Sequence, residues 1–177
     1  MHLKYTRFFL HSSALVACWS SDDNEREFAW QVIDGIVNGE ADVFASNELA
    51  LRTTLGILRG SEVADPLYPI VATSEASMAW RPAMRALFDH VVQVIYDMEA
   101  SGRITWLSPH RLRLAGLGIA LTFGLPVSDA AEVVLANHVS ASYVTPMLVN
   151  GTPYATRMGL IQGRSTAFQI LDLTDVI

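Results

Sequence analysis

The stretch Arg7-Phe8-Phe9-Leu10-His11-Ser12-Ser13-Ala14-Leu15-Val16-Ala17 places polar residues between two apolar runs. Phe8 to Leu10 begin a short apolar run that fits a buried strand. The run is far shorter than the ~20 residues that a membrane-spanning helix needs. Ligands of open parallel sheets bind beyond the carboxyl ends of the strands, so His11, Ser12 and Ser13 are the first candidates for a functional site.

The rest of the chain alternates between strand-like and helix-like segments. Strands are predicted at residues 8–10, 42–45, 104–107 and 143–145. Helix predictions rest on polar or proline residues at the starts of segments and, in most cases, on glycine near their ends. The predicted helices are residues 22–37, 46–58, 82–101, 108–123 and 129–138. This alternation predicts an α/β fold in which parallel strands are joined by right-handed crossovers and helices cover both faces of the sheet.

Two regions do not follow the alternation. Residues 61–80 contain Pro66 and Pro69 and predict an irregular insertion, around 60–81, that is longer than the usual connection. The tail, residues 151–177, has no assigned role, but residues 156–161 and 166–173 flank a turn and predict a C-terminal hairpin. We therefore expect residues 1–177 to form a single domain with one insertion.

Composition limits the classes of function. The 177 residues are 51% apolar and 17% charged, which fits one domain with a sizeable core. The single cysteine, Cys18, excludes an internal disulfide, and no predicted segment spans a membrane, so we expect a cytoplasmic protein. The net charge of −6 argues against broad electrostatic binding of nucleic acid.

Two acids stand where a parallel sheet would place a ligand. Glu48 follows the second predicted strand, and Asp129 begins the helix at residues 129–138. Carboxylates that converge at such an edge can hold Mg²⁺ or Mn²⁺, which prefer oxygen ligands. Alternatively, each acid lies in the first turn of a helix, where the helix dipole stabilises it by roughly 0.3–1 kcal/mol. The residues alone leave both interpretations open.

The order of these segments resembles the PIN-domain family, which includes the VapC-type ribonuclease toxins. The family opens with a strand that ends in Asp-Ser-Ser-Ala-Leu-Val-Ala, and this chain has His11 followed by the same six residues. Asn47-Glu48-Leu49-Ala50 is similar to the context of the family's second acid, and Asp129-Ala130 to that of its third. The resemblance implies a PIN-like α/β/α sandwich around a central, mainly parallel sheet.

The chain departs from the family at two acidic positions. His11 stands in place of the first aspartate, and Met147 stands in place of the fourth acid after Thr145-Pro146. Each missing carboxylate removes a ligand that offsets the dehydration of Mg²⁺, and methionine is a poor ligand for a hard cation. We therefore expect weak Mg²⁺ or Mn²⁺ binding at the remaining Glu48 and Asp129, which would be the catalytic pair of an active enzyme.

Two functions remain open at this point. In the first, the chain is a PIN-like protein without nuclease activity that acts as a binding or regulatory module. In the second, it is a divergent VapC-type, metal-dependent ribonuclease in which His11 joins Glu48 and Asp129 as a metal ligand. The resemblance also implies a homodimer, RNA as a substrate and an antitoxin-like protein partner. The wide apolar stripe of the predicted helix at residues 82–101 independently favours a homodimer that uses this helix. Ser12 and Ser13 are interpreted as strand-end hydroxyls because no base is evident near them in the sequence.

Overall fold

The central element of the computed structural model is a five-stranded sheet in which every strand pair is parallel. The structure describes residues 2–60, 75–146, 153–163 and 169–177. The strand order is β3-β2-β1-β4-β5. The strands are β1 (Arg7–Leu10), β2 (Asp42–Ser46), β3 (Ile104–Leu107), β4 (Ser142–Val144) and β5 (Ile170–Leu171).

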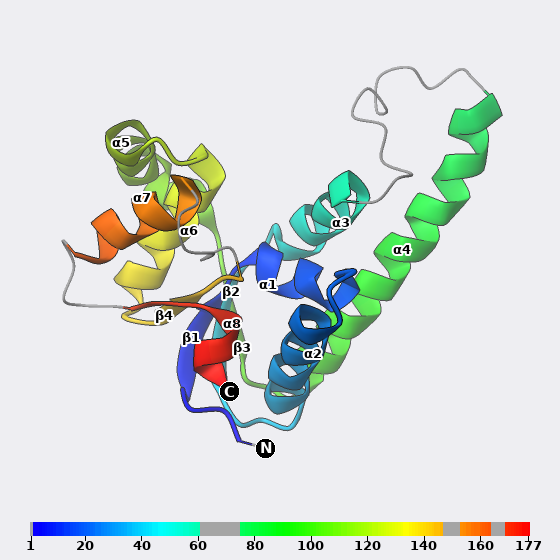
Figure 1. The fold of residues 1–177 in the computed structure, drawn as a ribbon, viewed down its shortest axis with the longest axis horizontal. Coiled ribbons are helices and arrows are strands. Elements are labelled where there is room, and N and C mark those ends of the chain that lie inside the picture. The colour runs from blue at the N-terminus through cyan, green and yellow to red at the C-terminus, as the bar shows by residue number, and fades with distance from the viewer. Residues whose placement is uncertain (1, 61–74, 147–152, 164–168) are drawn as a thin grey trace.

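Helices cover both faces of this sheet, so the predicted α/β/α sandwich is confirmed. In Figure 1, α1 to α4 lie on one side of the strands, and α5, α6 and α7 lie on the other. The helices are α1 (Ser12–Val16), η1 (Ala17–Trp19), α2 (Asp23–Val37), α3 (Leu49–Gly60), α4 (Glu75–Ala100), η3 (Pro109–Leu112), α5 (Arg113–Phe123), α6 (Val127–His138), α7 (Pro153–Gln162) and α8 (Leu173–Val176).

Strand β1 supplies both cores of the molecule. Side chains alternate between the faces of a strand, so Phe8 and Leu10 enter the core under α2 and α4, whereas Phe9 enters the core under α6 and α7. All three are at most 1% exposed. A strand that is buried on both faces needs an apolar run rather than an alternating pattern, and this is what the sequence provides.

The register of β1 decides which residues meet at the carboxyl edge of the sheet. Leu10 pairs with Ala45 of β2 on one side and with Val144 of β4 on the other. The next residues, His11 and Thr145, therefore emerge together at the carboxyl edge. The strand order reverses between β1 and β4, and this is the crevice at which sheets of this class bind ligands.

The predicted C-terminal hairpin is wrong. Residues 156–161 lie within helix α7, and β5 adds to β4 as a further parallel strand. Met158 and Ile161 are both buried in the second core, and their three-residue spacing suits one face of a helix. Pro153 is also acceptable at the first position of a helix because that position needs no hydrogen-bonded N–H.

Other helix boundaries differ from the sequence prediction. Helix α4 begins at Glu75, so Pro82 lies inside the helix and residues 75–80 of the predicted insertion are helical. Residues 61–74 of that insertion lie outside the described residues. Pro82 is exposed, so solvent can hydrogen-bond the carbonyl that loses its partner. The predicted helix at 108–123 is divided into η3 and α5.

Helix α6 begins at Val127, two residues before its predicted start at Asp129. Pro126 is its N-cap, and its side chain makes no capping hydrogen bond. Asp129 therefore lies in the first turn of the helix, as predicted, and its carboxylate is available for contacts outside the helix.

Within the described ranges, no single helix is long and apolar enough to cross a membrane. Residues Leu114–Phe123 and Val127–His138 reach that length and composition only as a pair bent by 115°. Most of α6 is buried inside the protein.

Candidate functional site

Four charged or ionisable side chains meet at the carboxyl edge of the sheet, and we call them the charged cluster: His11, Arg52, Asp129 and Glu132. His11 follows β1, Arg52 lies in the first turn of α3, and the two acids lie three residues apart on α6, a spacing that places them on one helix face. His11, Asp129 and Glu132 are 3%, 8% and 1% exposed. Charges buried this deeply need partners.

Arg52 is the cation of the cluster and binds both acids. Its Nη2 donates to Asp129 Oδ1 at 2.6 Å, and its Nη1 donates to Glu132 Oε1. The planar guanidinium has several donors in a fixed geometry, so one arginine can bridge two carboxylates. The side chain of Arg52 is only 17% exposed, so these ion pairs are largely removed from solvent.

His11 faces the acids with one nitrogen and the start of α1 with the other. Its Nδ1 accepts from the backbone N–H of Ser13 at 3.2 Å, which makes His11 the N-cap of α1. Its Nε2 lies 3.4 Å from Glu132 Oε2 and 3.6 Å from Asp129 Oδ1. Because Nδ1 acts as an acceptor, we assign the ring proton to Nε2, the nitrogen that lies nearer the two carboxylates.

Ser13 and Thr145 join the ends of the two strands that border the crevice. Ser13 Oγ lies 2.5 Å from His11 Nδ1 and 2.9 Å from Thr145 Oγ1. Ser13 therefore has a base within hydrogen-bond distance, which its interpretation from sequence did not include. The acids that would support His11 as a base already pair with Arg52, however, and this arrangement does not favour nucleophilic catalysis.

The environment shifts the pKa values of the two acids in opposite directions. Burial raises the pKa of Glu132, and His11 and Arg52 offset this effect only in part. Burial also acts to raise the pKa of Asp129, but His11 and Arg52 outweigh it and lower this pKa. Burial acts to lower the pKa of Arg52, yet Glu132 and Asp129 raise it. The arginine therefore stays charged, and Asp129 is the acid that ionises more readily.

The structure brings together two of the three residues predicted for the metal site. His11 and Asp129 belong to the charged cluster, whereas Glu48 immediately precedes α3 and lines a cavity of about 170 Å³ beside Arg52 and Glu132. Met147, where the resemblance predicts a further acid, lies outside the described residues.

Sequence reasoning missed Arg52 and Glu132. Arg52 lies four residues after Glu48, and Glu132 lies three residues after Asp129, so each shares a helix face with a predicted site residue. This spacing was the available signal. It did not by itself indicate that the arginine would turn toward the acids rather than toward solvent.

The two acids of the charged cluster are already engaged by an internal cation. Among the described residues, no three His, Cys, Asp or Glu side chains are arranged to hold a metal ion. Asp129 Oδ1 and Glu132 Oε1 already accept from the guanidinium of Arg52. A hard cation at these acids would be left with the oxygen atoms that Arg52 does not contact, and it would lie beside a permanent positive charge.

No protein-family model matches the chain, and no curated protein matches it.

Proposed function

We propose that the chain is a PIN-like protein without nuclease activity that acts as a binding or regulatory module. The observation that carries this proposal is the pairing of Arg52 with both Asp129 and Glu132. In the family that the sequence resembles, acids at this edge hold a metal ion. Here an internal cation neutralises them, and His11 stands where the family has its first acid.

The physical argument rests on competition for the carboxylate oxygens. The Arg52 guanidinium is part of the chain and already lies beside the acids, whereas Mg²⁺ must lose water before it binds. Buried ion pairs with hydrogen bonds are also strongly unfavourable to break, because the remaining charge loses its partner. The charged cluster therefore favours a structural role for the acids over metal catalysis.

The test compares the unmodified protein with Arg52→Ala and with the surface control Arg103→Ala. Arg103 pairs with Asp42 at 3.0 Å, and its side chain is 53% exposed. Each protein is titrated with Mn²⁺ and Mg²⁺ by calorimetry and incubated with RNA and metal. We expect no metal-dependent heat or cleavage from the unmodified protein or from Arg103→Ala. We expect Arg52→Ala to bind Mn²⁺, because His11, Asp129 and Glu132 become available as ligands.

One result would reverse the proposal. If the unmodified protein cleaves RNA in a metal-dependent way and Asp129→Asn abolishes that cleavage, the divergent ribonuclease is the correct function. This decision does not depend on whether Arg52→Ala folds, since it uses the unmodified protein and a conservative substitution of a neighbouring acid.

The proposal includes a homodimer, and the structure changes the surface on which we place it. The apolar stripe of α4 motivated this expectation from the sequence, but Val91, Ile95 and Met98 are buried in the chain's own core. Helix α5 instead exposes leucines along one face: Leu114 (86%), Leu117 (41%) and Leu121 (79%). An apolar face of this kind is typical of a surface that meets another subunit.

A further inference from the structure

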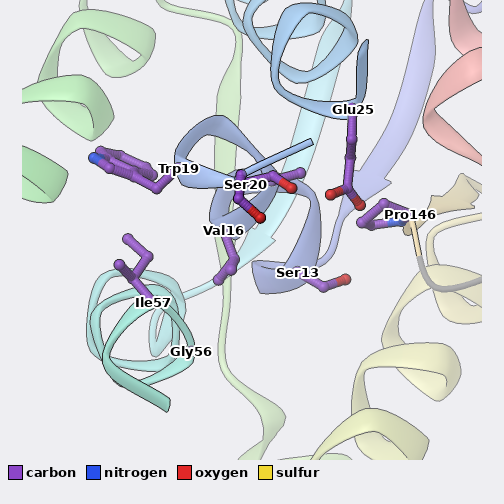
Figure 2. A pocket seen from close by; sticks show the side chains of 10 residues that line it. Ser13, Val16, Trp19, Ser20, Glu25, Gly56, Ile57 and Pro146 are labelled. Carbon is purple, nitrogen blue, oxygen red and sulfur yellow. The ribbon is translucent and has the colours of Figure 1, made fainter. Parts of the chain in front are cut away.

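A second cavity, of about 410 Å³, lies at the ends of β1 and β4, where Ser13 and Pro146 both line it. Its size lies in the range of sites for small organic ligands. Elements far apart in the sequence form its walls: the segment from α1 to the start of α2, the middle of α3, and the residue after Thr145 (Figure 2). We call it the switch-point pocket.

The two sides of the switch-point pocket differ in chemistry. Trp19 and Ile57 form an apolar side together with Val16, and Trp19 is braced by the ring of Trp30, 5.9 Å away. Figure 2 shows the carboxylate of Glu25 on the opposite side, near Pro146. A ligand that fits both sides needs an apolar body and a polar group at one end.

Two polar side chains of the lining, Ser13 and Glu25, present hydrogen-bond acceptors. Because Nδ1 of His11 acts as an acceptor, the hydroxyl of Ser13 donates its proton to that nitrogen, and Ser13 Oγ can offer only a lone pair to a ligand. The carboxylate of Glu25 accepts only when it is ionised. Among the described residues, the Glu25 carboxylate has no hydrogen-bond or ion-pair partner, since Arg26 pairs with Asp23 instead.

The start of α2 does not offer donors to compete with these acceptors. The first free N–H groups of a helix often bind anions, but here Asp22 Oδ1 accepts from the N–H groups of Asn24 and Glu25 at 2.9 and 3.1 Å. Glu25 is the one charged residue among those described as lining the pocket, and the net charge of −6 adds to the attraction for cations. Arg26 also lies near the pocket, where its Nη1 donates to the carbonyl of Ser20 at 2.9 Å, but its charge is paired with Asp23. An anionic ligand is disfavoured at this place.

We propose that the switch-point pocket binds a small organic ammonium ion with an aromatic or branched apolar body. The ammonium donates to the Glu25 carboxylate and to Ser13 Oγ, and the body packs against Trp19 and Ile57. A charge-assisted hydrogen bond supplies the selectivity, and the burial of the apolar body supplies much of the affinity. The inference rests on the proposed function, because it names the ligand class of the binding module.

The test uses three probes of nearly equal shape: phenethylamine, the neutral 2-phenylethanol and the anionic phenylacetate. Each is titrated into ¹⁵N-labelled protein, and binding is followed through the indole N–H signal of Trp19, assigned with Trp19→Phe. We expect phenethylamine to bind about tenfold more tightly than 2-phenylethanol, with phenylacetate the weakest. Equal binding of the amine and the carboxylate would overturn the proposal, as would no shift of the Trp19 signal with phenethylamine.

A matched pair of variants assigns the effect to the pocket. Glu25→Gln and Glu27→Gln remove the same charge from the same helix, but Glu27 lies outside the pocket and pairs with Gln31. We expect Glu25→Gln to weaken phenethylamine binding about tenfold and Glu27→Gln to change it by less than about twofold. If both variants lost the same affinity for phenethylamine, general charge attraction would explain the binding, and the proposed role of Glu25 in the pocket would be wrong.

Failure of this inference differs from failure of the proposed function. The metal titration and RNA cleavage experiments decide the proposed function, and none of the probes enters them. The ¹⁵N spectrum also shows directly whether each variant is folded. If Glu25→Gln were not folded, the ranking of the three probes on the unmodified protein would still decide the proposal.

Discussion

Arg52 Nη2 lies 2.6 Å from Asp129 Oδ1, and this ion pair joins two helices from opposite sides of the sheet. Arg52 lies on α3 and Asp129 lies on α6, and the same guanidinium also reaches Glu132. Figure 1 shows α3 and α6 on opposite sides of the strands, so the charged cluster joins the two helical layers at the carboxyl edge of the sheet.

Arg52→Met should destabilise the protein by roughly 3 kcal/mol, since it leaves two buried carboxylates without their cation. Equilibrium unfolding in urea measures the loss. Arg103→Met is the control, because the Arg103 side chain is 53% exposed and the loss of an exposed ion pair should change the free energy of unfolding by at most about 1 kcal/mol. Equal losses in the two variants would contradict the structural role of the cluster.

The stability contributed by Asp129 should disappear in acid. Its pKa is lowered from the ordinary value of 3.8, so the ionised form favours the folded state. This contribution is fully present above about pH 4 and is lost as the pH falls through the folded-state pKa. Asp129→Asn should therefore destabilise the protein near neutral pH and have a smaller effect in acid. Urea unfolding over this pH range provides the measurement. If Asp129→Asn lowered the free energy of unfolding by the same amount at every pH, the ionised Asp129 carboxylate would not be the stabilising form.

Glu132 should show the opposite dependence on pH. Its pKa is raised from the ordinary value of 4.5, so its contribution to stability is fully present below about pH 4.5 and is lost as the pH rises through the folded-state pKa. The stability of Glu132→Gln relative to the unmodified protein should therefore increase as the pH rises through that range. The same unfolding series tests this sign, and a relative stability that falls with pH would refute it.

Cys18 should not react with alkylating agents while the protein is folded. Burial raises the pKa of its thiol to about 12, so at pH 8 only about one thiol in ten thousand is ionised, and the thiolate is the reactive form. Mass spectrometry after treatment with iodoacetamide should show unmodified protein in buffer and one addition in urea. Rapid modification of the folded protein would show that Cys18 is accessible.

The exposed face of α5 should mediate self-association. Leu121→Gln replaces an apolar side chain that is 79% exposed, so it should leave the fold intact and weaken a dimer by at least tenfold if that side chain becomes buried in the interface. Analytical ultracentrifugation measures the association. Leu160→Gln on α7, where Leu160 is 57% exposed, is the matched control. A monomeric unmodified protein at tens of micromolar would rule the dimer out.

The sequence predicted the central layers of the fold well because β1 is buried on both faces. Phe8 and Leu10 enter one core and Phe9 enters the other, so all three residues are apolar. A continuous apolar run of this kind is a pattern that can be recognised in a sequence. The tail could not be predicted in the same way. Strand β5 has only two residues, Ile170 and Leu171, and a strand this short has no recognisable period.

The candidate site was predicted in part, and for a physical reason. His11 and Asp129 follow motifs with fixed positions at the ends of elements, so the sequence placed them at the carboxyl edge. The role of Arg52 depends on a contact between α3 and α6, 77 residues apart. No local spacing encodes such a contact, and an arginine on a helix is more often a solvated residue.

The position of β1 also has a consequence for biosynthesis. Strand β1 is synthesised before its partner β4 and before the outer strand β5, both of which lie far along the chain from it. The backbone N–H of Lys4 also donates to the carbonyl of Val176 at 2.8 Å. Most of the chain must therefore leave the ribosome before the β4 edge of β1 is covered. Until then Phe8 and Phe9 border an unpaired strand edge, which makes the nascent chain a natural client for chaperones.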